Sequence, residues 1–286
     1  MYVYVNGKIV HSEEANISVF DHGFMYGLGV FETFRVYNGH PFLLDDHFQR
    51  LQESLAMLDV HWSYQKQDVL TILEQLLEAN QLRDAYVRWN VSAGRGPLGL
   101  QAQGYEEPTV IAYMKPIQTT IETVEKDAVI LGTRRNSPEG EKRLKSHHFL
   151  NNILGKRELG TRVNTEGIFL TNDDYLAEGI VSNLFWVKEG TLYTPAVETG
   201  ILDGVTRQFI LTLAHTDGIK CKTGFYDLDD LLSCDEAFIT NSIQEIVPLK
   251  MIDSYLLPGK EGEVTKGFLQ RYQQVTAQLW SRKELR

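Results

Sequence analysis

The chain has 286 residues, 43% of them hydrophobic and 23% charged, which is the ordinary balance of a globular protein with one large domain or two modest ones. Its net charge of -10 argues against a nucleic-acid partner, because phosphate backbones are bound through surplus lysine and arginine. The N-terminus lacks the basic and apolar stretches of a signal peptide, and eighteen apolar residues never run together, so we expect a cytoplasmic protein without a membrane span.

The first third of the chain alternates strand and helix patterns. Alternating valines before the Asn6-Gly7 pair predict a strand and a tight turn. Two helices follow, because apolar residues recur at helical spacing in DDHFQRLQESLAML from Asp45 and again in QDVLTILEQLLEAN. Further strands are expected in AYVRWNVSAG, where Arg88 and Asn90 form a polar face, and in PTVIAYMKP.

The periodicity is lost in KPIQTTIETVEKD, which we interpret as a linker between two domains. We place a small N-terminal domain at residues 1–117, the linker at 118–126 and a larger domain at 127–286. Strands in the larger domain are expected in AVILGT, EGIFLT, VSNLFWV, TLYTP and EAFITN. Helices are expected from about Ser146, from about Thr206 and in KGFLQRYQQVTAQLW. Because strands outnumber helices and several are consecutive, the predicted fold class is α+β.

Two patterns that are typical of dinucleotide or metal binding are weak here. Gly94, Gly96 and Gly99 spell GxGxxG, but the polar segment after them does not predict the helix that a dinucleotide loop needs. We favour a mobile glycine loop over a pocket. The cysteines, Cys221 and Cys234, lack metal-ligand spacing, and no metal site is expected.

Lys145, in RLKSHHFLNNILGK, is a candidate for covalent chemistry on a carbonyl group. An amine in a desolvated pocket loses its proton more readily and can then act as a nucleophile. Glu178, in LAEGIVSN, stands at the entry to a strand before Ser182 and Asn183, where its carboxylate could pair with a protonated pyridine nitrogen. Taken singly, each of the two charged residues also has the simpler interpretation of a surface charge.

A small-anion site is predicted where GILDGVTRQFI begins a helix. Gly204, Val205 and Thr206 would offer backbone N–H groups and a hydroxyl at the helix N-terminus. Arg50 lies off the apolar stripe of the first helix and could offer a bidentate fork to a phosphate. By spacing alone, an ordinary helix cap and a surface arginine remain open as alternatives.

Several segments, in combination and order, are similar to the fold-type IV pyridoxal-5′-phosphate (PLP) enzymes. This class contains the branched-chain and D-amino-acid aminotransferases and the aminodeoxychorismate lyases. The segments span nearly the whole chain: DHGFMYGLGVFETFRV, HFQRL, YVRW, RLKSHHFLNN, AEGIVSNLFWV, TGILDGVTR and FITNSIQEIVP. The resemblance implies PLP as cofactor, a small N-terminal α/β domain, a larger domain with a mainly β core, and a homodimer.

The resemblance also implies roles for individual residues. Lys145 would form the Schiff base and act as general base, while Glu178 would hold the pyridine nitrogen and Leu202 would pack on the ring. The remaining cofactor contacts would come from Arg50, Ser182, Asn183, Gly204, Val205, Thr206, Thr240 and Asn241.

Within the class, FDHGFMYGLGVFETFR and RLKSHHFLNN look most like the aminodeoxychorismate lyases of Gram-positive bacteria. These enzymes convert 4-amino-4-deoxychorismate to 4-aminobenzoate and pyruvate, a step toward folate. Phe31 and Ala93 stand where D-amino-acid aminotransferases have a tyrosine and a carboxylate-binding arginine. Arg88 in YVRW matches the arginine in the YIRP segment of the branched-chain enzymes, so transamination stays the alternative. A non-catalytic binding protein is the third hypothesis.

Substrate contacts are expected on the polar strand face. Thr33 shares this face with Phe31 and is our candidate for handling the proton of the leaving group, against the simpler interpretation of a β-branched core residue. Arg88, and after it Arg95 in the glycine loop, are candidates for binding the substrate carboxylates. His147 is a candidate pocket-lining residue, with packing or capping as its alternative.

Overall fold

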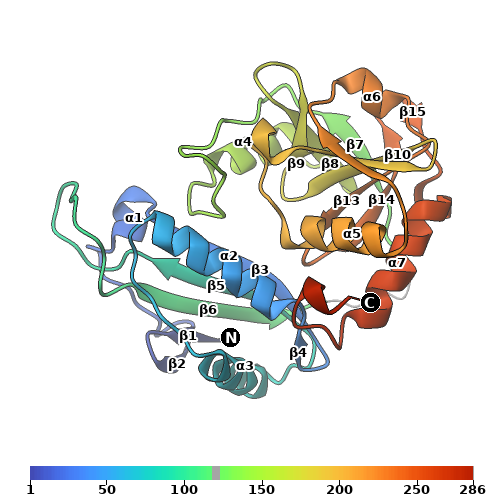
Figure 1. The fold of residues 1–286 in the computed structure, drawn as a ribbon. Coiled ribbons are helices and arrows are strands. Elements are labelled where there is room, and N and C mark those ends of the chain that lie inside the picture. Colours follow the sequence, from blue (N-terminus) through green and yellow to red (C-terminus); the bar gives the residue numbers. More distant parts are fainter. Residues whose placement is uncertain (118–122, 286) are drawn as a thin grey trace. The chain divides into compact units, whose positions relative to one another are not determined.

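A computed structural model describes residues 1–117 and 123–285 of the chain (Figure 1). The described residues form two compact units. The first unit contains residues 1–117, 144–148 and 276–281, and the second contains residues 123–143, 149–275 and 282–285. The predicted linker at 118–126 lies in part outside the described residues, so the predicted domain limits stay predictions. Nowhere in the two described ranges is a helix long and apolar enough to cross a membrane.

The first unit is built on a six-stranded antiparallel sheet with the strand order β2-β1-β6-β5-β3-β4. The strands are β1 (Tyr2–Val5), β2 (Lys8–His11), β3 (Gly29–Tyr37), β4 (His40–Pro41), β5 (Ala85–Ser92) and β6 (Thr109–Pro116). The helices are α1 (His22–Tyr26), α2 (Leu44–Met57) and α3 (Lys66–Asn80). The two predicted helices and the strands predicted at β1, β5 and β6 are confirmed.

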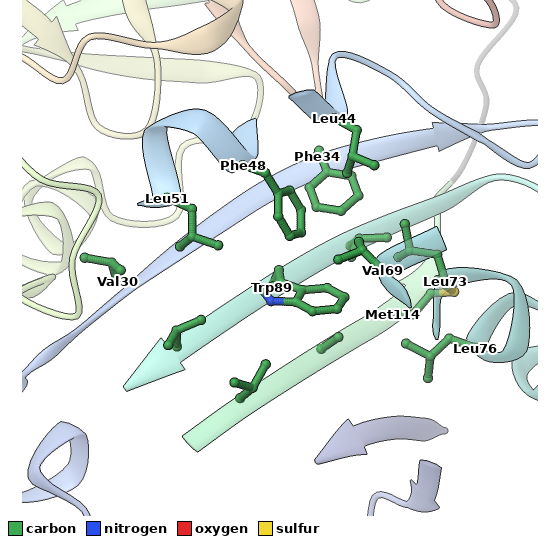
Figure 2. Close-up of a cluster of buried hydrophobic side chains, with 14 of the residues drawn as sticks. Val30, Phe34, Leu44, Phe48, Leu51, Val69, Leu73, Leu76, Trp89 and Met114 are labelled. Atoms are coloured by element: carbon green, nitrogen blue, oxygen red, sulfur yellow. The ribbon is translucent and has the colours of Figure 1, made fainter. Parts of the chain in front are cut away.

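One face of this sheet packs against helices α2 and α3. Because successive side chains of a strand point to opposite faces, Phe34 of β3 and Trp89 of β5 share the face that meets Phe48 of α2 (Figure 2). Burying such large side chains contributes roughly 2–3 kcal/mol each. The predicted apolar stripe of α2 is confirmed, since Leu51 and Leu55 lie in the same buried cluster.

The other face of the sheet carries polar side chains. In the ladder between β3 and β5, Phe31 is paired with Asn90 and Thr33 is paired with Arg88. Residues directly opposite each other in an antiparallel pair lie on the same face. The predicted polar face of β5 is therefore confirmed, and it continues onto β3.

The second unit contains a nine-stranded mixed sheet with the order β12-β11-β10-β13-β14-β7-β8-β9, and β15 pairs with β14. The strands are β7 (Lys126–Ile130), β8 (Thr165–Leu170), β9 (Leu176–Gly179), β10 (Asn183–Lys188), β11 (Thr191–Pro195), β12 (Cys221–Gly224), β13 (Glu236–Asn241), β14 (Glu245–Ile252) and β15 (Tyr255–Leu256). The α-helices are α4 (Leu150–Leu159), α5 (Val205–Thr216), α6 (Leu228–Leu232) and α7 (Glu263–Val275). Short 3-10 turns occur at η1 (Val197–Thr199), η2 (Gly259–Glu261) and η3 (Arg282–Glu284). The two sheets with their flanking helices confirm the predicted α+β fold class.

Two predicted helix limits are wrong. The helix expected from about Ser146 begins at Leu150, because the residues before it pair with β3, where Ser146 forms a β-bridge with Val30. Those residues cannot use the same backbone groups for a helical turn. The C-terminal helix α7 ends at Val275 and not at Trp280, and the residues that follow pair with the first unit.

The glycine loop between β5 and β6 is tied to α1. Gly94 and Gly99 have φ angles of 79° and 102°, a backbone region that favours glycine. His22 Nε2 lies 2.9 Å from the carbonyl oxygen of Pro97, and the Gly99 N–H donates to the Tyr26 hydroxyl at 2.8 Å. Because the loop leads into a strand and not a helix, the GxGxxG pattern is not a dinucleotide-binding loop here.

Candidate active site

Lys145 belongs to a short segment that extends the sheet of the first unit. The Phe31 N–H donates to the Lys145 carbonyl at 2.9 Å, and the His147 N–H donates to the Gly29 carbonyl at 3.0 Å. This antiparallel pairing sets Lys145 opposite Phe31 and His147 opposite Gly29, and opposite residues share a face. The candidate lysine therefore lies on the polar face of β3 and β5.

Two cationic side chains lie over one phenyl ring on this face. Lys145 Nζ is 4.7 Å from the centre of the Phe31 ring, and Arg88 Cζ is 3.5 Å from it. Phe31 is only 3% exposed, so the ring removes water from beside both cations. Burial also lowers the pKa of the Arg88 guanidinium. Among the described residues Arg88 has no carboxylate partner, so an anionic ligand would find an uncompensated charge here.

The His147 side chain crosses over Gly29 of β3 and reaches Asn90 of β5. Its Nε2 lies 2.9 Å from Asn90 Oδ1, and a Cβ atom at Gly29 would lie 2.4 Å from the His147 ring. Glycine is therefore required at position 29 for this crossing. Burial, and after it the neighbouring Arg88, lowers the pKa of His147 to about 4. The imidazole is neutral at pH 7 and donates its Nε2 proton to the Asn90 carbonyl oxygen.

Arg50 is part of a buried cluster on the opposite side of β3. Arg50 Nε and Nη2 donate to the two carboxylate oxygens of Glu32, at 2.8 Å and 2.7 Å. His47 Nδ1 lies 2.7 Å from Glu32 Oε2. Burial by itself raises the pKa of Glu32, but Arg50 and His47 outweigh it and bring that pKa to about 2. The arginine predicted to bind phosphate is thus held by a carboxylate that the sequence did not single out.

Glu178 lies in the second unit, buried near the end of β9, where it accepts two hydrogen bonds and has a further guanidinium nearby. Arg135 Nε donates to its Oε1 at 2.8 Å, and the Leu202 N–H donates to its Oε2 at 3.0 Å. Arg143 Nε is 3.8 Å from Oε1. Burial, and after it the charge of Arg135, lowers the pKa of Arg143 to about 10, which leaves it charged at pH 7. The carboxylate therefore has a fixed orientation between two guanidinium groups.

The N-terminus of α5 lies beside a group of hydroxyls in the second unit. Its cap residue, Gly204, makes no side-chain capping bond, and the Thr206 hydroxyl lies 3.2 Å from the Ser242 hydroxyl. Within the described ranges, the buried hydroxyl of Thr240, which pairs with Asn183 across the ladder of β10 and β13, has no hydrogen-bond partner. The buried Ser182 hydroxyl has no partner there either, but it lies against Gly179 and not beside α5. A buried hydroxyl without a partner is costly unless a ligand satisfies it. This donor set fits the phosphate of a small cofactor at a helix N-terminus.

The other predicted cofactor contacts in this unit hold one another in place. Asn183 Nδ2 donates to the Leu202 carbonyl at 2.8 Å. A Cβ atom at Gly204 would lie 2.1 Å from Asn183 Oδ1, so only glycine fits there. The Asn241 side-chain oxygen, in contrast, accepts the N–H groups of Ile243 and Gln244 and closes a turn. In this part of the chain it is Ser242, which the prediction passed over, whose hydroxyl meets Thr206.

The structure brings some predicted substrate residues together and leaves one aside. Phe31, Thr33, Arg88 and His147 lie on one face of the first unit's sheet. Arg95 is exposed in the glycine loop, and its guanidinium lies 6.0 Å from the Phe20 ring. The sequence did not single out several residues that hold the candidate groups: Glu32, His47, Asn90, Arg135, Arg143 and Ser242. Of these only Asn90 carried a signal, its place beside Arg88 in the strand alternation.

Comparisons with known proteins identify the family of the chain. A family model described as amino-transferase class IV matches residues 29–252. An aminodeoxychorismate lyase of Bacillus subtilis (strain 168) is 48% identical over 265 residues, which are 92% of this chain and 90% of that protein. The solved structure of an Escherichia coli branched-chain amino acid aminotransferase matches with a TM-score of 0.86 at 29% identity, covering 96% of this chain and 94% of that one. A 4-amino-4-deoxychorismate lyase from Pseudomonas aeruginosa matches with a TM-score of 0.83 at 27% identity, covering 96% and 98%. The chain belongs to the amino-transferase class IV family.

Proposed function

We propose that this chain is a PLP-dependent 4-amino-4-deoxychorismate lyase that releases 4-aminobenzoate and pyruvate. The observation that carries the proposal is the 48% identity to the Bacillus subtilis lyase across nearly the full length of both chains. The aminotransferase alternative keeps support from the Escherichia coli structure, at a lower identity of 29%. Phe31 and Ala93, at the positions where D-amino-acid aminotransferases have a tyrosine and an arginine, also favour the lyase.

PLP, when bound, supplies an electron sink for the charge left by proton removal. Lys145 Nζ would hold the cofactor covalently and, once freed by the substrate amine, would take the proton from the amine-bearing carbon. Glu178 would hold the protonated ring nitrogen, and Arg135 fixes the carboxylate for that contact. Arg50 and the α5 N-terminus would hold the phosphate, together with the hydroxyls of Thr206, Thr240 and Ser242.

The polar face of β3 and β5 would receive the substrate. Arg88 would bind one substrate carboxylate, because its charge has no carboxylate partner among the described residues, and Arg95 is the second candidate. Thr33, paired with Arg88 across the ladder, would hold or pass the proton that the leaving enolpyruvyl group needs. Neutral His147 would line the same face without adding a charge.

A homodimer is part of this proposal, and exposed apolar side chains of the first unit support it. The glycine loop is tied to the region of α1 by hydrogen bonds from Gly99 to Tyr26 and from Gly96 to Phe20. Exposed apolar residues therefore gather there: Ile17, Val19, Phe20, Phe24, Leu98 and Leu100. Such clusters are typical of protein interfaces.

Sedimentation should give twice the 32.6 kDa of one chain. Phe24→Asp should dissociate the dimer and Leu256→Asp should not; a fully active monomer would contradict the proposal.

A cytoplasmic location is also proposed. It is supported by Cys221 and Cys234, which are both free thiols, as expected in a reducing compartment. Cell fractionation would test it, and recovery of the protein outside the cytoplasm would refute it.

The test of the activity is product analysis with 4-amino-4-deoxychorismate. We expect 4-aminobenzoate and pyruvate in equal amounts, with no need for a keto acid. The same incubation with 2-oxoglutarate added should not be faster. A requirement for 2-oxoglutarate, or glutamate formation faster than 4-aminobenzoate formation, would replace the lyase by a transaminase.

A further inference from the structure

Glu32 is a fully buried carboxylate on the side of β3 that packs against α2. It is 1% exposed, and both of its oxygens are used by side chains of α2, namely Arg50 and His47. Apart from these two side chains, the residues around it on that face are apolar: Val30 and Phe34 flank it along β3, and Trp89 is paired with it on β5. A buried ion pair is often no more stabilising than a well-packed apolar pair of the same size. Stability of the fold therefore does not by itself explain why a carboxylate and a guanidinium, and not apolar side chains, occupy this buried position.

The geometry of the pair fixes the direction of the arginine. Glu32 meets the edge formed by Nε and Nη2, and a bidentate contact sets both the plane and the rotation of the guanidinium. The pair takes two of the five N–H donors of the guanidinium. The Arg50 side chain is 15% exposed while that of Glu32 is 1% exposed, so the arginine is the member that reaches outward.

His47 holds the carboxylate without adding charge. Burial lowers the pKa of His47, the hydrogen bond and charge of Glu32 raise it, and with the charges of Arg50 and Lys145 the net shift is downward. The neutral imidazole donates through Nδ1 to Glu32 Oε2, the oxygen that also accepts from Arg50 Nη2. Glu32 and His47 thus together fix the orientation of one guanidinium, that of Arg50.

We propose that Glu32 is a positioning residue for phosphate recognition: with His47 behind it, it sets the orientation in which Arg50 meets the phosphate of the cofactor. This inference rests on the proposed function, which assigns the phosphate to Arg50. It predicts that losing Glu32 weakens binding of a phosphate-bearing cofactor selectively, and that Glu32 has no effect once Arg50 is gone.

The experiment compares two ligands that differ only in the phosphate. Apo-protein of the full chain is titrated with PLP and with pyridoxal, for the wild type, Glu32→Gln, Arg50→Ala and the double variant. We expect Glu32→Gln to weaken PLP binding about tenfold and pyridoxal binding by less than twofold. Arg50→Ala should weaken PLP binding by about a hundredfold, and the double variant should bind PLP no more weakly than Arg50→Ala.

Two further variants guard against a simple folding defect. Glu236→Gln removes another buried carboxylate, one that accepts the backbone N–H groups of Val264 and Thr265 at the start of α7, and it should leave the PLP-to-pyridoxal preference unchanged. Glu32→Asp keeps the charge but is too short for the same bidentate contact, so it should lose part of the preference even if Glu32→Gln does not fold.

The outcomes separate the inference from the proposed function. If Arg50→Ala lowers the preference for PLP while Glu32→Gln and Glu32→Asp keep it, or weaken both ligands equally, Glu32 is only structural and the inference is overturned. If Arg50→Ala itself keeps the preference, the phosphate assignment within the proposed function fails.

Discussion

Two charged sites, Glu178 in the second unit and Arg88 in the first, are held in different ways. In the second unit Glu178 lies between Arg135 and Arg143, so each of the two guanidinium groups has a carboxylate beside it. In the first unit Arg88 lies on the Phe31 ring and has no carboxylate partner among the described residues. A carboxylate between two guanidinium groups keeps a fixed orientation, whereas a guanidinium without a carboxylate partner attracts an anionic ligand. Under the proposed function, the difference fits a fixed carboxylate for the cofactor ring at Glu178 and an open cation for a substrate carboxylate at Arg88.

Replacing Lys145 should have the largest effect. Lys145→Arg keeps the positive charge on the polar face but removes the amine that bonds to the cofactor and takes the proton. We expect kcat to fall by about 10⁴-fold or more, because general-base catalysis alone contributes roughly 10²–10⁴-fold. Lys142→Arg, at an exposed lysine three residues earlier, is the matched control and should keep the wild-type rate. A kcat of Lys145→Arg within tenfold of the wild-type kcat would contradict the catalytic role of Lys145.

Glu178→Gln should come next, because it removes the carboxylate charge that lies between Arg135 and Arg143. The variant leaves Arg135 and Arg143 facing a neutral amide, so we expect kcat to fall about 10²-fold or more. Breaking a buried pair should also lower the free energy of unfolding by about 3–5 kcal/mol. Steady-state kinetics and urea unfolding measure the two effects. Unchanged kcat with lowered stability would make Glu178 a purely structural residue.

Arg88→Ala should affect the substrate and not the cofactor. A hydrogen bond to a charged group is worth about 1.5–3 kcal/mol, so KM for the carboxylated substrate should rise roughly 10- to 100-fold. The absorption spectrum of the bound cofactor should stay unchanged. Arg95→Ala is the comparison, since that guanidinium is exposed near Phe20, and its effect should be smaller. An equal increase of KM in the two variants would contradict the assignment of the substrate carboxylate to Arg88.

The smallest effect concerns His147 and acid. Its folded-state pKa of about 4 is below the ordinary 6.5, so the unfolded chain binds the proton first as pH falls. The free energy of unfolding should therefore drop by about 2–3 kcal/mol between pH 6.5 and 4 on account of this group. His147→Gln should show a correspondingly weaker pH dependence in urea unfolding over that range. An identical pH dependence in the two proteins would show that His147 is not held neutral.

The sequence predicted the parts of the molecule that depend on local patterns. Helical spacing identified the stripe of Phe48, Leu51 and Leu55, and strand alternation identified the polar face of Arg88. The resemblance to a known class supplied the order of the motifs. These signals lie within one element or one motif, where the period of the backbone is visible.

Contacts between distant segments could not be predicted in this way. Lys145 was expected at the edge of a helix, but its segment pairs with β3, more than a hundred residues earlier in the chain. Arg135 reaches Glu178 across 43 residues that include helix α4 and strand β8, and Glu32 interrupts an otherwise apolar side of β3. Such partners follow from the tertiary arrangement, to which a single sequence gives no direct signal.

The most direct test of the account asks where the cofactor is bound. The PLP-loaded protein is reduced with borohydride, digested and mapped by mass spectrometry. We predict a phosphopyridoxyl group on the peptide that contains Lys145, and none after Lys145→Arg. A phosphopyridoxyl group on another lysine, or none in the wild type, would contradict the central claim.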